Sequence, residues 1–356
     1  MIQDLNRSIV DFFLVKVLII SPTHKGIGGI AQHVQGLSNF LTKNDHDVDI
    51  MSSENTFTLP IKGLKNPSFM ISSFLKSKFK KGNDIVHAHN IPAALAMKNA
   101  SGKKVLTLHG IYSQQVELLH GKTTGKLSGS YEKDALSWAD AITVVSKEGY
   151  EHYRKLGFEV NLVPNAIDIS SLPDKEERLY KKQIIFAGRL SKEKGIYTLI
   201  EIAKKLDEDT YLIIVGSGPE ENSIKKLAKT KKNIDFLGYQ PRERTVSLIR
   251  GSDILIQPSF VEAISSTVLE AMTCKTCVIA SEIGGNRELI EDSTDGFLVD
   301  PNDSDQFLDK IEDLFSNQEK RNQFSQHSFD KVQKYDWNYV GKLYLNIYES
   351  LLNEPK

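Results

Sequence analysis

Two glutamates stand on either side of a hydroxyl-rich segment in the last third of the chain. Glu262 and Glu270 enclose the Ser-Ser-Thr triplet 265–267, and the segment lies between the apolar runs 254–258 and 277–280. Because short apolar runs are typical of buried strands, the segment is predicted to connect a strand to a helix. Carboxylates there can accept hydrogen bonds from sugar hydroxyls, and the free N–H groups at the start of the helix can bind a phosphate. A nucleotide-sugar presents both groups.

Two cations and two glycines follow strands predicted earlier in the same half. Arg189 and Lys194 would stand at a strand end and a helix start, where two positive charges can neutralise a diphosphate. Gly216 and Gly218 follow the next strand, and their lack of side chains lets a ligand ring approach the backbone. These positions share one edge of a predicted sheet, in the order that a nucleotide-diphosphate site requires.

Each signal also has a purely structural interpretation. The two cations would serve as solvated surface charges, and the two glycines as parts of a tight turn. The spacing from Thr267 to Glu270 matches a capping box, in which Glu270 would bind only a backbone amide. The agreement of all the signals on one sheet edge favours a ligand site.

A glycine-rich segment opens the first predicted helix. Its Gly26-x-Gly28-x-x-Ala31 pattern matches a dinucleotide-binding fingerprint. Residues 21–25 separate the strand end from the first glycine, however, and a pyrophosphate turn is normally tighter. The other interpretation is a loop whose glycines let a phosphate or sugar approach the helix N–H groups across a cleft.

Short β-rich runs alternate with longer amphipathic stretches, which predicts βαβ units and parallel sheets, an α/β fold. The strands are expected at 15–21, 47–52, 84–88, 104–108, 141–145, 160–163, 183–187, 211–215, 234–237, 254–257, 277–280 and 297–299. The helices are expected at 29–42, 91–99, 130–138, 147–156, 194–206, 219–229, 241–250, 266–273 and 303–316. Two such Rossmann-like halves in tandem would face a central cleft.

The domain boundaries follow from a polar segment, 170–182, which carries a proline and reads as a linker. It divides an N-terminal domain, 1–170, from a C-terminal domain, 171–335. The remaining stretch, 336–356, is aromatic with a helical pattern, and we expect it to pack partly on the N-terminal domain.

Composition limits the class of protein. The 356 residues carry a net charge of −1, which argues against a bulk nucleic-acid binder. Two cysteines cannot form a disulfide framework, so a reducing cytoplasm fits. No apolar stretch approaches the roughly 18 residues that a spanning helix needs, so no membrane anchor is expected.

Together the motifs resemble those of the family-4 retaining glycosyltransferases, which have the two-domain GT-B architecture. The resemblance runs from about Val15 to about Tyr348. It rests on Gly188-Arg189-Leu190 with Lys194-Gly195, on Glu262-x7-Glu270-Ala-Met, and on Val278-Ile-Ala-Ser281 with Gly284-Gly285. Singly these motifs are not specific to the family, but in combination they are.

The resemblance implies a role for each candidate. The catalytic residues would be Glu262, near the transferred sugar, and His109, although a histidine at a strand end is more often structural. The donor diphosphate would be bound by Arg189, Lys194, Gly28, Gly29, Ser265 and Ser266. The ribose and nucleoside would be bound by Glu270, Gly216 and Gly218. The cleft would also be lined by His33, Asn165 and Thr267.

Two segments depart from the family pattern. Ala263-Ile264-Ser265 replaces the usual glycine turn after the first glutamate, so the sugar preference does not follow from the resemblance. Lys275 stands where a glycine is common, which predicts a different backbone geometry in that turn. We expect the adjacent Cys274 and Cys277 to be packed in the core, since a zinc site needs a second pair of ligands.

The implied reaction moves a sugar, of the hexosyl type, from an NDP-sugar to an acceptor hydroxyl with retention of configuration. No second carboxylate is placed as a nucleophile, so front-face attack assisted by the leaving phosphate is expected. The Asp-x-Asp triplets lie in polar turns or strand starts, so neither an obligatory metal nor a cofactor is expected. A nucleotide-sugar epimerase, an NAD-dependent dehydrogenase and a non-enzymatic nucleotide-sugar-binding protein remain as alternatives.

A basic segment at 61–81 bears on the acceptor. Six lysines between Thr56 and Asn83 are interleaved with apolar residues, with no acidic residue among them. Such a segment can lie on an anionic membrane surface, in which case the acceptor is lipid-linked, not a free glycan, and the protein is peripheral on the inner face of the membrane. A solvated helix with ordinary core contacts explains the pattern equally well.

Overall fold

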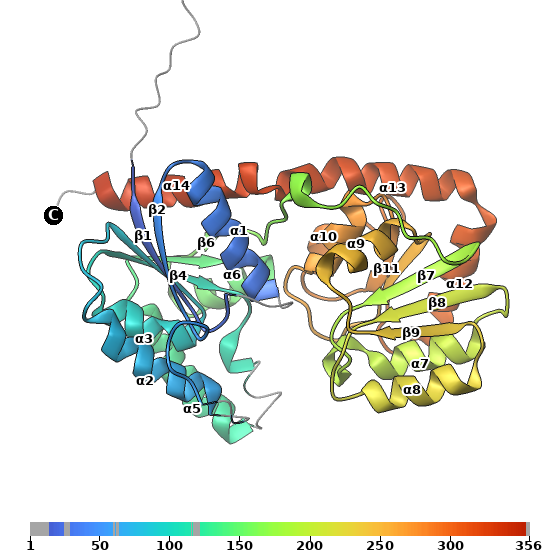
Figure 1. Ribbon diagram of the computed structural model, residues 1–356, viewed down its shortest axis with the longest axis horizontal. Coiled ribbons are helices and arrows are strands. Elements are labelled where there is room, and N and C mark those ends of the chain that lie inside the picture. Colours follow the sequence, from blue (N-terminus) through green and yellow to red (C-terminus); the bar gives the residue numbers. More distant parts are fainter. Residues whose placement is uncertain are drawn as a thin grey trace, which may run out of the picture.

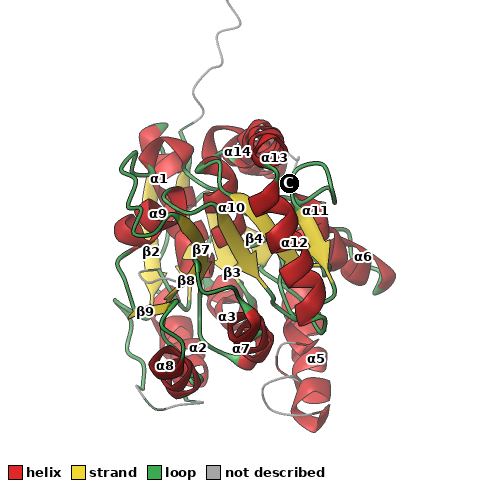
Figure 2. Ribbon diagram, turned by 90° about the vertical axis from the view of Figure 1, so that its right-hand side faces the viewer, coloured by secondary structure: helices red, strands yellow, loops and turns green. Residues whose placement is uncertain are grey.

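The computed structural model describes residues 14–24, 29–59, 61, 64–114, 116 and 122–353. These residues form two lobes, each built on a six-stranded sheet (Figure 1). All the strand pairs are parallel, and helices lie on both faces of the sheets (Figure 2). Parallel sheets need this cover because both of their faces are apolar. The predicted α/β class with two Rossmann-like lobes is confirmed.

The first lobe has the strand order β2-β1-β3-β4-β5-β6. Its strands are β1 (Lys16–Ser21), β2 (Asp47–Ser52), β3 (Ile85–His89), β4 (Lys103–Leu108), β5 (Ala141–Val144) and β6 (Asn161–Leu162). Its helices are α1 (Gly29–Lys43), α2 (Lys65–Ser77), α3 (Ile91–Asn99), α5 (Lys122–Leu136) and α6 (Lys147–Lys155). The β-branched and leucine residues of β1 are fully buried, as expected of a strand covered on both faces.

The second lobe has the order β12-β11-β10-β7-β8-β9. Its strands are β7 (Lys182–Ala187), β8 (Thr210–Val215), β9 (Ile234–Gly238), β10 (Ile254–Gln257), β11 (Cys277–Ser281) and β12 (Phe297–Val299). Its helices are α7 (Ile196–Lys205), α8 (Glu221–Thr230), α9 (Arg242–Arg250), α10 (Ser266–Thr273), α11 (Asn286–Leu289), α12 (Ser304–Ser316) and α13 (Gln318–Val332). Two apolar clusters, one on each face of this sheet, form its core.

The end of the chain crosses back to the first lobe. Helix α13 lies over the second lobe, and α14 (Trp337–Asn353) continues along the same side of the molecule over the first lobe (Figure 1). Tyr344 and Tyr348 of α14 are fully buried against β1 and α1. The ring of Trp337 occupies the space beside Gly36, where a β-carbon would lie only 2.0 Å from its Nε1. The last helix therefore completes the core of the first lobe.

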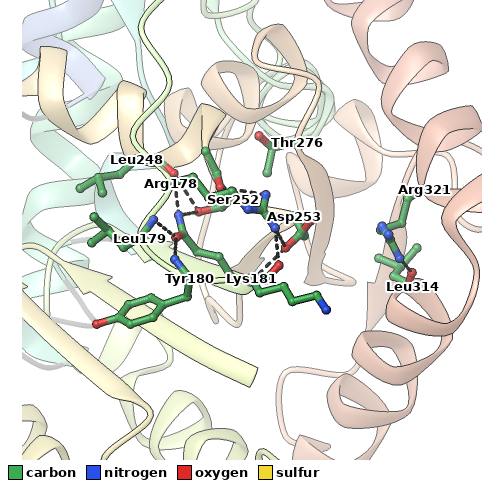
Figure 3. Close-up of polar contacts among 12 residues, drawn as sticks. Arg178, Leu179, Tyr180, Lys181, Leu248, Ser252, Asp253, Thr276, Leu314 and Arg321 are labelled. Atoms are coloured by element: carbon green, nitrogen blue, oxygen red, sulfur yellow. Dashed lines mark hydrogen bonds and ion pairs between the residues drawn. The ribbon is translucent and has the colours of Figure 1, made fainter. Parts of the chain in front are cut away.

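The segment before β7 is held against the second lobe by polar contacts (Figure 3). Asp253 accepts hydrogen bonds from the Arg178 guanidinium at 2.7 Å and from the Gln183 N–H at 2.9 Å. The Gln183 side chain in turn accepts from the N–H groups of Leu179 and Tyr180. The polar residues predicted as linker thus dock on the second lobe over their last few positions.

The predicted strands are all present within one residue of their expected ends. The helices differ more: α5 begins at Lys122, eight residues before the expected start, and neither α11 nor α13 was predicted. Helix α2 was absent from the expected set as well, since a helix there was only the structural alternative for the basic segment. Helix α13 buries only Phe324, Ser328 and Val332, and so few apolar positions give no clear helical period. No helix in the described part of the chain is long and apolar enough to cross a bilayer.

Candidate active site

A cavity of about 440 Å³ lies where the lobes meet, at the carboxyl ends of β7 and β8. Gln32 of α1 contributes to its wall from the first lobe. The predicted residues that line it are Arg189, Gly216, Gly218, Ser266, Thr267 and Glu270. Residues from three separate strand-to-helix connections therefore line one cavity, as their predicted position at one edge of the sheet implies.

Glu270 is the buried charged group of this cavity. Its side chain is only 6% exposed, and its Oε1 accepts a hydrogen bond from Arg242 Nε at 2.8 Å. Burial raises the pKa of Glu270 above its ordinary value, while the charge and hydrogen bond of Arg242 lower it. A buried carboxylate with one oxygen in an ion pair keeps its second oxygen as an acceptor for a ligand hydroxyl.

The capping-box interpretation of Glu270 is wrong. Ser265 caps α10, and its Oγ accepts a hydrogen bond from the N–H of Val268 at 3.4 Å. The same Oγ also accepts from Gln257 Nε2 at 2.7 Å. Glu270 is therefore free of the helix start and turns toward the cavity. The Ser265 hydroxyl, predicted at the diphosphate, is instead occupied within the protein.

Glu262 lies in a second polar centre, next to the first. Its Oε1 accepts hydrogen bonds from Lys194 Nζ at 2.5 Å, Gln257 Nε2 at 2.8 Å and Ser259 Oγ at 3.0 Å. The glutamate side chain is 8% exposed, and that of the lysine 28%. Three donors on one oxygen fix the carboxylate at a single position and leave Oε2 for a further contact. The predicted Lys194 and Glu262 thus meet directly.

Close backbone contacts set the position of the loop that carries both cations, between β7 and α7. A β-carbon on Gly195 would lie 1.7 Å from the carbonyl oxygen of Pro258, so only glycine lets Lys194 approach Glu262 this way. Gly216 has φ +143°, and a β-carbon there would lie 1.8 Å from the carbonyl oxygen of Gly188. This glycine is therefore required by loop packing whether or not a ligand is bound.

Two further spaces lie beside the Glu262 loop. Arg189, which lines the first cavity, also lines a larger space of about 830 Å³ with Lys194, Tyr197 and Phe260. A third space, of about 290 Å³, is formed by residues of both lobes, including Gly110 of the first and Glu262 of the second.

Direct hydrogen bonds hold the lobes together beside these spaces. Asn165 Nδ2 donates to the carbonyl of Ile264 at 2.9 Å, which places this predicted cleft residue at the junction. The N–H of Lys147, at the start of α6, donates to Glu288 Oε1 at 2.7 Å. Burial raises the pKa of Glu288, although these contacts with α6 act against the rise.

Four histidines form a buried cluster on the first lobe. His89 Nδ1 and His109 Nε2 are 3.1 Å apart and share a hydrogen bond, and the His87 ring stacks on that of His89. Helix α14 closes the cluster, because Tyr344 bonds to His33 Nε2 at 3.0 Å and Tyr348 to His87 Nδ1 at 2.6 Å. His33 thus belongs to this cluster in the core and does not line any of the three spaces described above.

Burial keeps these rings uncharged at neutral pH. It lowers the pKa of His109 to about 4 and that of His87 to about 3, with His109 adding to the effect at His87. Burial and the neighbouring histidines also hold the pKa values of His33 and His89 well below their ordinary value. The side chain of Asn165 acts in the opposite direction at His33 and His109, but burial dominates.

One ring nitrogen from each of His33, His89 and His109 lies within 4.8 Å of the others. Three nitrogens bound to one zinc at 2.0–2.1 Å would be about 3.4 Å apart, so this spacing is wider than a metal requires. His89 and His109 also bond directly to each other. The four histidines therefore form a hydrogen-bonded network with the two tyrosines of α14. Cys274 and Cys277 are buried free thiols.

The remaining predictions concern turns. Gly28 lies outside the described residues, while Gly29 begins α1 with open space where a β-carbon would be. Lys275 has a left-handed backbone, with φ 57°, in the region of backbone conformations that favours glycine. The different geometry predicted for that turn stays a prediction.

Sequence reasoning missed the partners of the predicted residues. Arg242 lies 28 residues from Glu270 in the sequence. The usable signal for Arg242 was its position at the start of a predicted helix that follows a strand. Gln257 ends the strand before Glu262 and Ser259 follows two residues later, where polar residues after an apolar run were a usable signal. No sequence signal related Tyr344 to the histidine cluster, because Tyr344 is 311 residues from His33.

Two family profiles match the chain and together span residues 27–330. The profile described as Glycosyltransferase Family 4 matches 27–171, and that described as Glycosyl transferases group 1 matches 170–330.

Similar curated proteins share most of the length. The chain is 27% identical to an uncharacterized glycosyltransferase of Methanocaldococcus jannaschii, over 95% of this chain and 99% of that protein. It is 23% identical to the phosphatidyl-myo-inositol mannosyltransferase of Mycolicibacterium smegmatis, over 91% of this chain and 90% of that one.

Solved structures show the same fold at low identity. Sucrose-phosphate synthase from Thermosynechococcus elongatus superposes with a TM-score of 0.80 at 19% identity, over 96% of this chain and 100% of that one. Anabaena HepE in complex with UDP gives a TM-score of 0.71 at 18% identity, over 94% and 100%.

Proposed function

Because the chain belongs to glycosyltransferase family 4 and has the GT-B fold, we propose that it transfers a sugar from an NDP-sugar to an acceptor hydroxyl with retention of configuration. One observation carries this proposal: a buried carboxylate, a largely exposed guanidinium and two close-packed glycine loops surround one cavity at the strand ends. Such an arrangement suits a nucleoside diphosphate, since it offers an acceptor for ribose hydroxyls and cations for the phosphates.

The donor is assigned to the second lobe. Glu270, oriented by Arg242, binds the ribose hydroxyls, and the glycines at 216 and 218 lie against the nucleoside. Arg189 is assigned to the diphosphate. Its side chain is 64% exposed and its only ion pair among the described residues, with Glu193, is long at 3.9 Å, so the guanidinium is available to a phosphate. The N–H groups at the start of α10, at Ser266 and Thr267, add the positive end of a helix. HepE, whose fold is shared, is described in complex with UDP.

The reacting sugar is assigned to the space beside Glu262. Its carboxylate, fixed by three donors on Oε1, binds sugar hydroxyls through Oε2. When the donor enters, Lys194 exchanges part of its contact with Glu262 for a phosphate oxygen, so its charge is applied where the leaving group develops negative charge. With Oε1 held by three donors and Oε2 assigned to sugar hydroxyls, neither oxygen of Glu262 is left to attack the anomeric carbon, which favours front-face attack assisted by the leaving phosphate.

The first lobe is assigned to the acceptor. His109 stands at the end of β4, next to Gly110, which lines the space shared with Glu262. An uncharged imidazole there offers a donor or an acceptor to the reacting hydroxyls without opposing the positive charge that builds on the sugar. The acceptor is a glycan or a lipid-linked sugar; a relative is named for a lipid acceptor, phosphatidyl-myo-inositol.

The reaction is proposed to need no metal. Arg189, Lys194 and a helix N-terminus supply the positive charge that a metal supplies elsewhere. Full activity after EDTA treatment is expected, and activity lost to EDTA and restored by Mn²⁺ would contradict it. Both cysteines are buried free thiols, which suits a reducing compartment such as the cytoplasm.

The test is a product analysis. UDP-, GDP- and ADP-sugars are screened by thermal shift, and any that stabilises the protein is incubated with acceptor candidates. We expect release of the nucleoside diphosphate only with an acceptor, and proton NMR should show the anomeric configuration of the donor in the product. An isomerised sugar formed from donor alone, or an inverted product, would contradict the proposal.

A further inference from the structure

Exposed apolar side chains are concentrated in one part of the first lobe. Of the sixteen large apolar side chains exposed in the described residues, seven lie between positions 57 and 79. They are Phe57, Leu59, Ile61, Leu64, Ile71, Leu75 and Phe79. We call this set with the lysines beside it the α2 face. Single exposed apolar residues are ordinary, but a cluster of this kind marks an interaction site.

Helix α2 presents two different sides. Phe69, Ser73 and Ser77 are buried and follow a spacing of four, so one side packs on the lobe, where α3 is its main neighbour. Ile71 and Leu75 point away at 63% and 55% exposure. Phe79, four residues further on, is 85% exposed, which is the most of any large apolar side chain described. The outward stripe is therefore apolar where a solvated helix would be polar.

The charge on this face has one sign. No acidic residue occurs between Asn55 and Asn83. Two of its lysines are held within the lobe, since Lys76 donates to the carbonyl of Asn55 and Lys80 pairs with Asp49. The three others described, at 65, 78 and 81, are exposed and form no ion pair with the described residues.

The combination of exposed apolar side chains and lysines limits the kind of partner that this face can bind. A second copy of the chain, meeting face to face, would bring like charges together around an apolar centre. Nucleic acid would match the lysines but leave the seven apolar side chains in water. An anionic lipid surface accommodates both, because apolar side chains enter the headgroup boundary while lysines reach the phosphates.

We infer that the α2 face docks on an anionic lipid surface through Phe79, Leu75, Ile71 and the apolar residues that precede α2. These preceding residues follow the carboxyl end of β2, and the backbone of His24, after β1, contacts Glu54 there. The same edge of the sheet carries His109 after β4. The α2 face extends from this cleft edge along α2 to Phe79, which precedes the start of β3. Docking therefore lays this side of the first lobe on the lipid, with one end of the contact at the cleft edge.

Docking also defines the acceptor class, in a step that rests on the proposed function. A cleft held at the surface would receive an acceptor anchored in that surface, which favours a lipid-linked sugar over a free glycan. The docking itself does not depend on any sugar transfer, so binding and catalysis can fail separately.

Co-sedimentation with vesicles tests the inference. Wild-type protein is mixed with phosphatidylcholine vesicles with or without 40% phosphatidylglycerol, at about 0.05 and 0.5 M NaCl. We expect pelleting only with the anionic vesicles, weakened at high salt. The variant Lys65→Glu/Lys78→Glu/Lys81→Glu should lose at least ~100-fold in partition coefficient, at roughly fivefold or more per charge. Phe79→Ser should lose ~10-fold, since it removes the most exposed aromatic ring from the boundary.

A matched control separates this face from net charge. Lys226, Lys229 and Lys232 of the second lobe are also exposed, and changing all three to Glu alters the charge equally. This variant should still bind the vesicles, and both triple variants should keep wild-type circular dichroism and melting. Equal loss in the two triple variants, or wild type left in the supernatant at low salt, would overturn the inference. So would a concentration-dependent dimer that Phe79→Ser abolishes, because the face would then serve self-association.

Discussion

The two lobes differ in the buried polar groups that they place at the cleft or directly behind it. On the second lobe, two nearly buried carboxylates are each paired with a cation, Glu262 with Lys194 and Glu270 with Arg242. On the first lobe, the polar groups behind the cleft are histidines that burial keeps neutral. On our proposal the charged wall of the second lobe binds a charged donor. The histidine cluster of the first lobe, which we call the neutral wall, backs the other side of the cleft without adding charge near the reacting carbon.

Removing the carboxylate closest to the proposed reaction should have the largest effect. Glu262→Ala leaves Lys194, Gln257 and Ser259 without their shared acceptor and removes the contact assigned to the sugar. We expect kcat to fall ~10³-fold, similar to the loss of one preorganised polar contact at a transition state. Steady-state kinetics with saturating donor measures it.

The matched control for this change is Glu282→Ala. Glu282 also follows a strand of the second sheet, but its side chain is 53% exposed and pairs with Arg287. Its kcat should stay within twofold of wild type. An equal loss in the two variants would show that the position of Glu262 has no special role.

Charging the neutral wall should destabilise the first lobe. The pKa of His109 is about 4 in the folded protein against an ordinary value of 6.5, so its contribution is complete above pH 6.5 and is lost as pH falls through 4. Between pH 7.5 and 5 the free energy of unfolding should fall by about 2 kcal/mol for this residue alone. Urea unfolding at the two pH values measures the loss.

His109→Gln should flatten this pH dependence, since the variant has one fewer ring to protonate. His327→Gln is the control, because His327 is exposed on α13 of the second lobe. If the variant at 109 keeps the full wild-type slope, the neutral wall is not where the acid sensitivity arises.

Neutralising the other buried carboxylate should weaken donor binding and change the chemical step little. Glu270→Gln removes the charge that orients Arg242 and the stronger acceptor for ribose hydroxyls. We expect the donor KM to rise ~10- to 100-fold with kcat within about threefold. Glu243→Gln, on α9 next to Arg242 and exposed, should leave both constants unchanged. A fall in kcat at constant KM would move Glu270 from binding to chemistry.

The smallest effect is expected from the helix that crosses between the lobes. Tyr348→Phe removes a buried hydroxyl that bonds to His87 at 2.6 Å, which should cost about 1–2 kcal/mol of unfolding free energy. Tyr339→Phe, on the same helix with its ring 55% exposed, should cost under about 0.5 kcal/mol. Equal melting temperatures for the two variants would show that α14 does not hold the histidine cluster in place.

The sequence predicted the strands better than the helices for a physical reason. Strands covered on both faces appear as unbroken apolar runs, as at 17–20, and their ends carried the motifs of the second lobe. Helix α13 could not be predicted, because its few buried positions leave no amphipathic pattern.

The candidate site was predictable in its parts but not in its pairings. Arg189, Glu262 and Glu270 stand after strands, where local pattern is informative. The partner of each acid comes from a distant segment, and no spacing in the sequence relates Arg242 to Glu270 across 28 positions. The histidine cluster depends on tyrosines from the end of the chain, so it exists only once α14 has packed on the first lobe.

Equilibrium binding of nucleoside diphosphates tests the division between the two walls most directly. UDP, GDP and ADP are titrated calorimetrically into wild type, Lys194→Ala and Lys192→Ala, the last being an exposed lysine in the same turn. At least one nucleotide should bind wild type and Lys192→Ala alike, and Lys194→Ala ~10- to 100-fold more weakly. Binding of none of the three, or equal affinity in all three proteins, would contradict the assignment of the diphosphate to the second lobe.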